Sequence, residues 1–392
     1  MQTFLAAMLL AAAPNLEVRT LDGATYTGSP VELSQERVRL DTSSGPVAIG
    51  VDRLLTATTV ASTTPFPQAT EVAVELVDGS RLSARAYSAT QTTALVQLTG
   101  GESLKIPTAQ VAFVRLLPLE ATLADQWSQI LGQAATADLL VVRKDQSLDY
   151  LEGVLRDIHA NTVNFELDGE VLEVKRSKVV GLAYFHARGD KFDDAIARVI
   201  DRGGSTFQAR SLSLAGDRLQ IALGCGLEIS RPLAAVDRLD FSEGKVIHLE
   251  DLDNDYKWTP VFGTADPESK LAALYRPRAA TSDQPLHVAG RSYTKGVALR
   301  SRTQASYRVP ESFRRFVAVA GLDDSAPRDG HVRLSVADER SELLSVPIRA
   351  GETPLAIDLE IAGARRLTVL VDFGENLDIG DQLNLCEARI TK

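Results

Sequence analysis

The feature that most constrains the fold is a repeat, because the chain carries four copies of one strand, turn and strand pattern. The copies read VRTLDGATYTG (18–28), VELVDGSRLSA (74–84), VRKDQSLDYLEG (142–153) and ARVIDRGGSTFQA (197–209). Apolar and polar residues alternate on both sides of a polar turn, which is typical of a β-hairpin. Asp-Gly pairs at 22–23 and 78–79 supply the positive φ angles that tight turns need. A fourfold repeat predicts a chain built from similar strand-rich units.

Each hairpin is followed by further short apolar segments that read as strands. We expect these strands at 38–40, 47–49, 54–55, 95–98, 104–106, 111–114, 163–167, 172–174, 179–182, 219–223, 227–229 and 236–239. Five strands in about 45 residues favour a small barrel of the SH3-like or Sm-like kind. We therefore predict an all-β fold whose small β-barrel repeats span 14–62, 63–117, 139–186 and 187–243.

One helix is expected between the second and third copies. The segment EATLADQWSQILGQAAT (120–136) places Leu123, Trp127, Ile130 and Leu131 at helical spacing. We predict a helical linker over 118–138, with Trp127 as its core anchor and two barrels on either side. The polar stretches 56–64 and 187–194 are the predicted linkers between barrels.

The N-terminus reads as a sorting signal. The ten-residue apolar run FLAAMLLAAA (4–13) has the length of a signal-peptide core and is too short to span a bilayer. The alternative is a buried N-terminal helix. We predict a signal peptide over 1–13 and an exported protein that is periplasmic, on the cell surface or extracellular, with no transmembrane segment.

Composition excludes several classes of function. The 392 residues include 42 Lys and Arg against 52 Asp and Glu, a net charge of -10 with no strongly basic segment, so nucleic acid is not an expected partner. The two cysteines, Cys225 and Cys386, exclude a disulfide scaffold and a four-thiolate zinc site. The four copies also carry no nucleophile and base pair or phosphate loop, so no catalytic residue is predicted.

From about residue 244 the pattern changes to longer strands with larger loops. We expect strands at 305–309, 315–322, 331–337, 355–361, 367–373 and 385–390. About 150 residues of such strands, without helical periodicity, favour a two-sheet jelly roll over 244–392.

Three segments of this part resemble the carbohydrate-binding module family NPCBM. They are YTKGVAL (293–299), FVAVAGLDD (316–324) and DQLNLCEARI (381–390). The resemblance implies a galactose-binding-like jelly roll that binds carbohydrate. The layout ahead of it, with YLEGV, FELDGEVLEVKRSK and DFSEGKVIHLEDL, resembles exported planctomycete-type proteins in which such a module follows small barrels.

The chain departs from this family at two positions. Arg300 stands where the family often has His, and Leu385 stands where it often has Trp. Sugar sites combine aromatic faces with polar groups. The candidate ligand-binding residues are Tyr293, Arg300, Arg302, Asp323, Asp324, Asp381 and Asn384. Tyr256, Trp258 and Phe262 could provide a relocated aromatic platform.

Each candidate has a structural alternative. Tyr293 fits a core or rim position, and the two arginines fit a solvated or ion-paired face. Asp323 and Asp324 fit turn caps, since Asp bonds to nearby backbone. Cys386 on an apolar strand is expected to be buried rather than reactive.

A possible calcium site is suggested by the oxygen-rich run DFGENLDIGDQLN (372–384). Calcium takes six to eight oxygen ligands from irregular loops, and Asp372, Asp378 and Asp381 are the candidate ligands, with Glu375, Asn384 and Asp323 nearby. The alternative is a solvated acidic loop.

These observations favour an exported, non-catalytic protein whose jelly roll binds a cell-wall polysaccharide or another extracellular glycan. The alternative is a structural or scaffolding protein that contacts other envelope proteins through its barrels and jelly roll. A glycoside hydrolase or its accessory is disfavoured, because no acid and nucleophile pair stands out.

Overall fold

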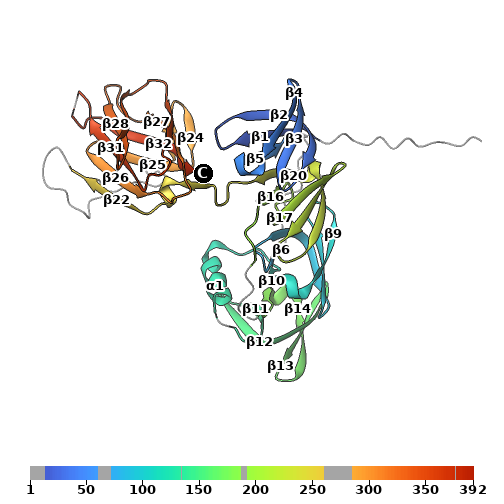
Figure 1. The fold of residues 1–392 in the computed structure, drawn as a ribbon. Helices are drawn as coiled ribbons and strands as arrows, with labels where there is room; N and C mark the ends of the chain where they lie inside the picture. Colours follow the sequence, from blue (N-terminus) through green and yellow to red (C-terminus); the bar gives the residue numbers. More distant parts are fainter. Residues whose placement is uncertain (1–13, 61–71, 134, 187–191, 260–284, 376) are drawn as a thin grey trace, which may run out of the picture. The chain divides into compact units, whose positions relative to one another are not determined.

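The computed structural model describes residues 14–60, 72–133, 135–186, 192–259, 285–375 and 377–392. They divide into two compact units, residues 1–243 and 244–392, which are considered separately (Figure 1). The predicted signal peptide and Phe262 lie outside the described residues. Strands dominate both units, and the described residues contain a single α-helix, so the all-β fold class is confirmed.

The N-terminal unit consists of four successive groups of five strands, called groups 1 to 4. Group 1 has β1 (Leu16–Thr20), β2 (Thr25–Leu33), β3 (Arg37–Thr42), β4 (Gly45–Gly50) and β5 (Leu54–Thr59). Group 2 has β6 (Val72–Leu76), β7 (Arg81–Ala89), β8 (Thr93–Leu98), β9 (Ser103–Pro107) and β10 (Val111–Arg115). Group 3 has β11 (Asp138–Lys144), β12 (Ser147–Ile158), β13 (Thr162–Leu167), β14 (Glu170–Lys175) and β15 (Val179–Ala183). Group 4 has β16 (Ala197–Asp201), β17 (Thr206–Ala215), β18 (Arg218–Leu223), β19 (Glu228–Pro232) and β20 (Val236–Asp240).

All four groups share one pairing order. The first strand pairs with the second and the fifth, and the second, third and fourth follow as an antiparallel meander. A 3-10 helix precedes the fifth strand each time, as η1 (Val51–Arg53), η2 (Thr108–Gln110), η3 (Arg176–Lys178) and η4 (Leu233–Ala235). The expected strands are therefore present, and their identification with SH3-like or Sm-like barrels stays a prediction.

The last residue of each repeated segment explains part of the repeat. Gly28, Ala84, Gly153 and Ala209 lie where the second strand meets the first strand and approaches the third. A Cβ at Gly28 would lie 2.4 Å from the Asp41 carbonyl oxygen, and one at Gly153 would lie 2.3 Å from that of Glu166. Only a small residue fits at this position.

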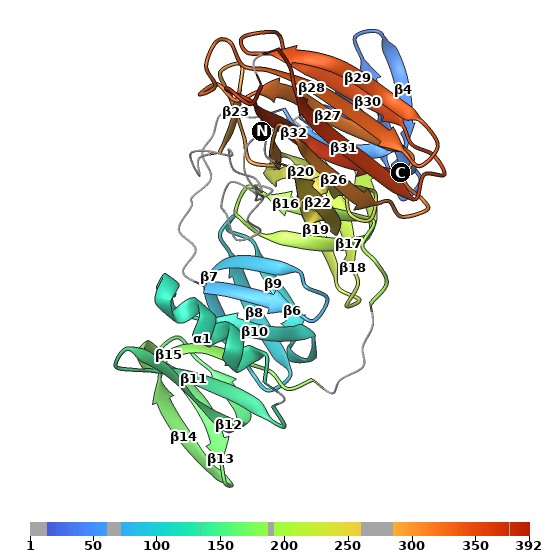
Figure 2. The same cartoon turned by 90° about the vertical axis from the view of Figure 1, so that its left-hand side faces the viewer.

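The helix α1 (Ala121–Leu131) lies where the sequence predicts it. In Figure 2, α1 lies beside β11 and β15. Trp127 is 7% exposed and packs with Ile130, Leu139, Val141 and Val180, which confirms its role as a core anchor. Its ring also accounts for Gly181, because a Cβ there would lie 2.3 Å from the indole.

The expected grouping of barrels around this helix is wrong. Strand β10 of group 2 pairs with β15 of group 3, and β5 of group 1 pairs with β20 of group 4. Group 2 thus pairs with group 3 and group 1 with group 4, and a shorter pairing of β7 with β17 also links groups 2 and 4. The pairing with β20 also places Thr56–Thr58 inside a sheet, so the predicted linker at 56–64 begins too early.

The C-terminal unit has two antiparallel sheets. One contains β21 (Val246–His248), β25 (Gly296–Arg300), β27 (Arg315–Leu322), β30 (Leu355–Glu360) and β32 (Gln382–Thr391). The other contains β22 (Asn254–Trp258), β26 (Thr303–Arg308), β28 (His331–Asp338), β29 (Glu342–Arg349) and β31 (Arg366–Phe373). A hairpin of β23 (Leu286–Val288) and β24 (Arg291–Tyr293) and the 3-10 helix η5 (Leu249–Asp251) complete it.

Both sheets contribute to one apolar core. Phe316 and Leu385 come from one sheet, and Tyr307, Leu334 and Val369 from the other. This two-sheet arrangement confirms the jelly-roll prediction. Strand β29 was not predicted from the sequence. It lies at the end of its sheet with most of its side chains at least partly exposed, so its apolar pattern is weak.

Candidate functional site

The Lys-Gly motif of the C-terminal unit is structural. The Lys295 ammonium lies 2.5 Å from the Glu250 carboxylate, which also accepts the Gly296 N–H at 2.5 Å. Gly296 has a φ of +138°, and a Cβ there would lie 2.3 Å from the Leu385 carbonyl oxygen. The motif therefore joins η5 to β25, and glycine is required by both backbone and space.

Asp323, Asp324 and Asn384 form one hydrogen-bonded network. Asp324 accepts the N–H groups of Ala289 and Gly290 at 2.8 and 2.9 Å, which caps the turn between β23 and β24. Asp323 accepts the Ser325 N–H at 3.0 Å and the Asn384 amide at 2.7 Å. Burial raises the pKa of Asp323, but the bonds from Ser325 and Asn384 outweigh it and hold the pKa below its ordinary value. The structural alternative describes Asp323 and Asp324 best, because their oxygens accept hydrogen bonds within the fold. The fully buried Asn384 donates to Asp323, and its Oδ1 has no hydrogen-bond partner among the described residues.

Two other predicted positions also serve packing. Tyr293 packs against the small cluster of Leu286, Val288, Ala298 and Cys386. Leu385 is fully buried in the main core, so a tryptophan at this position would be a core residue rather than a ligand platform in this chain. The departure from the family at Leu385 therefore does not weaken a sugar site. Burial raises the pKa of the free Cys386 thiol to about 12, as expected for an unreactive cysteine.

The remaining candidates meet in one small hollow of about 50 Å³. It lies between the turn joining β25 to β26, the end of β22 and the loop that leads into β32. We call it the Asp381 hollow, and its lining residues are Trp258, Arg300, Ser301, Arg302, Asp378, Gly380, Asp381 and Gln382. It combines a half-exposed indole, two guanidinium groups and two carboxylates, which are the chemical groups used to bind sugar hydroxyls and C–H faces.

Arg302 is held in an unusual conformation at the rim of the hollow. Its φ is +64°, in the left-handed region that costs energy for a residue with a side chain. Its carbonyl accepts the Thr259 N–H at 2.9 Å, and its guanidinium lies 5.6 Å from the centre of the Phe373 ring. Backbone and side chain are thus both fixed by the fold, so the arginine is pre-positioned beside the hollow.

Asp381 is the most unusual residue of the hollow. It is 4% exposed, its Oδ1 accepts the His331 N–H at 3.3 Å, and its buried Oδ2 has no hydrogen-bond partner among the described residues. Burial raises the pKa of Asp381 to about 6, against the lowering effects of the Ser301 hydroxyl and the His331 amide. The charges of Asp378 and Asp372 add to the rise. A buried oxygen without a partner is what a ligand hydroxyl would complete.

The predicted calcium ligands are not gathered into a metal site. Among the described residues, no group of three or more His, Cys, Asp or Glu side chains could hold a metal ion. Glu375 pairs with Arg349 at 2.9 Å instead, and Arg349 holds the pKa of Glu375 below its usual value. Calcium binding by Asp372, Asp378 and Asp381 therefore stays a prediction from composition.

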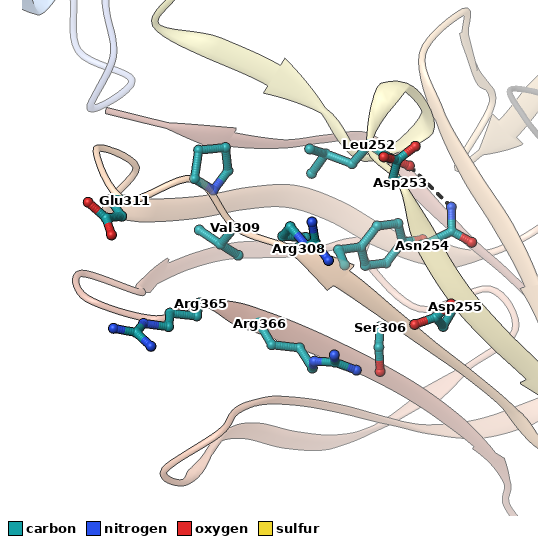
Figure 3. Close-up of a pocket in the computed structure, with 12 residues that line it drawn as sticks. Leu252, Asp253, Asn254, Asp255, Ser306, Arg308, Val309, Glu311, Arg365 and Arg366 are labelled. Atoms are coloured by element: carbon teal, nitrogen blue, oxygen red, sulfur yellow. Dashed lines mark hydrogen bonds between the residues drawn. The ribbon is translucent and has the colours of Figure 1, made fainter.

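A larger hollow of about 690 Å³ lies beside β22 and β26 (Figure 3). Its charged residues are of both signs, with Asp253, Asp255 and Glu311 opposed by Arg308, Arg365 and Arg366. Its aromatic residue, Tyr307, is fully buried in the core and offers no exposed face. This hollow contains no residue that the sequence singled out.

Three residues at the Asp381 hollow were missed by sequence reasoning. Ser301 and Gln382 line it, and His331 donates its backbone N–H to Asp381 from a strand 50 positions away. Ser301 and Gln382 are neighbours of predicted residues, which is a usable signal. His331 gives no such signal, because its contribution is a backbone group.

No helix among the described residues is long and apolar enough to cross a membrane.

Similar solved structures include several CBM51 modules. A CBM51 module from Clostridium perfringens GH95, in complex with methyl-galactose, is 15% identical with a TM-score of 0.32, over 37% of this chain and 99% of that one. The tandem CBM51 modules of Sp3GH98 from Streptococcus pneumoniae are 12% identical with a TM-score of 0.33, over 66% and 89%. The CBM51-2 and INT domains of Clostridium perfringens ZmpB are 14% identical with a TM-score of 0.32. That match covers 50% of this chain and 43% of the ZmpB chain.

The sequence comparisons agree with the resemblance of the C-terminal segments. No curated protein matches the chain. The matching family model covers most of the C-terminal unit and none of the four strand groups. Residues 254–391 match the NPCBM/NEW2 domain.

Proposed function

We propose that the protein is an exported, non-catalytic glycan-binding protein whose C-terminal unit binds a cell-wall or extracellular glycan at the Asp381 hollow. The family match at 254–391 supports the class of ligand. The observation that carries the location is the buried Oδ2 of Asp381, which has no partner among the described residues and lies in a hollow also lined by Trp258 and Arg302.

The size of the hollow limits what it takes. About 50 Å³ is far below the roughly 300–1,000 Å³ of a pocket that encloses a small ligand. A whole pyranose ring does not fit inside. We therefore expect the hollow to take one or two hydroxyl groups of a terminal sugar, donated to Asp381, while a C–H face of the ring packs on Trp258.

Catalysis is a weaker explanation of the same residues. Asp378 and Asp381 both line the hollow, and a raised pKa is a property of a general acid. A glycosidase, however, holds the scissile bond between its two carboxyl groups. A hollow of this volume does not enclose a bond between two sugar rings.

The test is co-sedimentation of the full-length protein with insoluble cell-wall polysaccharides, alongside a Trp258→Ala variant. We expect the wild type to sediment and the variant to bind about threefold to tenfold more weakly, because an aromatic contact contributes roughly 0.5–1.5 kcal/mol. Tyr256→Ala is the matched control, since Tyr256 lies on the same strand at 44% exposure and does not line the hollow.

Two outcomes would contradict the proposal. A folded wild-type protein that sediments with none of the polysaccharides would favour a structural or scaffolding protein. Release of new reducing ends from a bound polysaccharide, lost in Asp381→Asn, would show an enzyme.

A further inference from the structure

The N-terminal unit carries a separate groove of about 780 Å³ between group 2 and group 3. We call it the basic groove. Segments far apart in the sequence form it: Arg85–Ser88 on β7, Leu95 and Gln97 on β8, Leu116 and Leu117 after β10, 160–162 between β12 and β13, and 175–177 at the start of η3. The groove therefore depends on the pairing of groups 2 and 3, through β10 with β15 and through β7 with β12.

The charge of this groove is opposite to that of the chain. Its lining residues include Arg85, Lys175 and Arg176 and no Asp or Glu, although the chain has a net charge of -10. Within the part of the chain that the structure describes, none of these three cations forms an ion pair with a carboxylate. Three cations converge on a cavity without the negative charge that would neutralise them.

Arg176 is fixed in place without such a partner. Its Nη1 donates to the carbonyl oxygens of Tyr87 at 2.7 Å and His159 at 3.1 Å, and its backbone N–H donates to Asn161 at 2.9 Å. Burial lowers the pKa of Arg176, because the charged form is desolvated. An anion in the groove would relieve this cost, so the site is prepared for a negatively charged ligand.

The groove also has an apolar side that decides the kind of ligand. Leu95 is 44% exposed and Leu117 is partly exposed, while Val72 and Leu116 are buried beneath this side of the groove. Its one aromatic residue, Tyr87, is 1% exposed with its hydroxyl 2.8 Å from that of Tyr184, so no ring face is offered to a sugar or a nucleobase. Cations around an apolar surface suit a peptide that alternates acidic and apolar side chains.

We propose that the basic groove binds an acidic, partly apolar peptide segment of a partner protein. This goes beyond glycan binding and does not depend on it, because the groove lies in the other unit. The C-terminal unit would then attach the protein to a glycan while the N-terminal unit holds a second protein.

The test is fluorescence anisotropy of the full-length protein with labelled synthetic peptides of about ten residues. One peptide alternates Glu and Asp with Leu and Val, and its matched isostere carries Gln and Asn instead. We expect saturable binding of the acidic peptide only, weakened as NaCl rises from about 50 to about 500 mM, because screening removes the charge attraction. The Arg85→Gln, Lys175→Gln double variant should bind about tenfold more weakly or worse, since both side chains are exposed and their loss leaves the fold intact.

Lys178→Gln is the matched control, because Lys178 is an exposed lysine of η3 that does not line the groove. It should bind as the wild type does. The proposal is overturned if the acidic peptide does not bind at about 50 mM NaCl, or if the double variant and the control bind equally well. Binding of polygalacturonate or single-stranded DNA in place of the peptide would overturn it as well, in favour of another polyanion.

Discussion

The two units bury aspartates in opposite ways. Asp201 in the N-terminal unit is 3% exposed, and Asp381 in the C-terminal unit is 4% exposed. Asp201 accepts the Ser205 N–H at 2.8 Å and pairs with the Arg231 guanidinium at 2.8 Å. Asp381 receives one backbone N–H at 3.3 Å, and its second oxygen has no partner among the described residues.

Under the proposed function, this difference separates a structural charge from a ligand-binding one. Arg231 is itself 1% exposed and also pairs with Glu102, so this buried cluster joins group 4 to group 2. Arg231 opposes the charge of Asp201, although burial still raises the pKa of Asp201. Asp381 instead lines a hollow beside Arg300 and Arg302, and its Oδ2 has no hydrogen-bond partner among the described residues. This fits the proposed site, where a ligand hydroxyl would supply the missing contact.

The largest effect should come from breaking the structural charge. Asp201→Ala leaves the buried Arg231 with Glu102 as its ion-pair partner, so the loss should lie toward the lower end of the about 3–5 kcal/mol that breaking a buried pair costs. We expect the free energy of unfolding of the N-terminal unit to fall by this amount in urea. The chain has two tryptophans, so a Trp258→Phe background makes Trp127 fluorescence report on this unit alone.

Glu17→Ala is the control, because Glu17 pairs with Arg19 on the surface of the same unit. Exposed pairs contribute about 0–1 kcal/mol. Equal losses for Asp201→Ala and Glu17→Ala would mean that the buried cluster does not stabilise the unit, and the contrast with Asp381 would lose its basis.

The second-largest effect should be a gain in stability, from removing the charge of Asp381. The pKa of Asp381 is raised to about 6, while an unfolded aspartate titrates near about 3.9. Between these values the folded state binds more protons, so this group's contribution to stability is present at low pH and declines as pH rises through that window. Asp381→Asn removes the charge and should stabilise the C-terminal unit at pH 7, by something on the order of 1 kcal/mol, with no gain at pH 4.

Urea unfolding at both pH values checks this, with Trp258 as reporter in a Trp127→Phe background. If Asp381→Asn were less stable than the wild type at pH 7, the carboxylate would be a stabilising charge like Asp201. The two units would then bury aspartates in the same way.

Calcium should have the smallest effect. The carboxylates of Asp372, Asp378 and Asp381 are not gathered into a group that could hold a metal ion, so millimolar calcium should shift the melting temperature relative to EDTA by less than about 2 °C. Differential scanning calorimetry of the full-length protein measures the shift. A larger rise that Asp378→Asn abolishes would establish the calcium site and make metal binding the reason for the buried carboxylate at Asp381.

Much of the fold is predictable because it is local. Alternation and turn residues place the strands of all four groups, and helical spacing places α1 around Trp127. Which groups pair was not predictable, since the pairing of β10 with β15 depends on residues about 70 positions apart that carry no pairing signal. The sequence repeat predicts the four strand groups, and long-range contacts determine which groups pair with one another.

The candidate site was predictable in part, for a related reason. Three of the seven ligand-binding candidates, Arg300, Arg302 and Asp381, meet in the hollow. Asp323 and Asp324 share their chemistry, but they accept hydrogen bonds from neighbouring loops, and Asn384 is fully buried beside Asp323. Residue type shows which side chains can bind a sugar, and only the structure shows which of them are already used.

Asp381 gives the most direct test of the account. A glycan array probed with the full-length wild type, Asp381→Asn and Glu360→Gln compares the hollow with an exposed carboxylate of the same unit, at the end of β30. We predict that the wild type and Glu360→Gln retain the same glycans, and that Asp381→Asn, though folded and at least as stable at pH 7, loses them. Equal retention by all three proteins would contradict the claim that the Asp381 hollow binds the glycan.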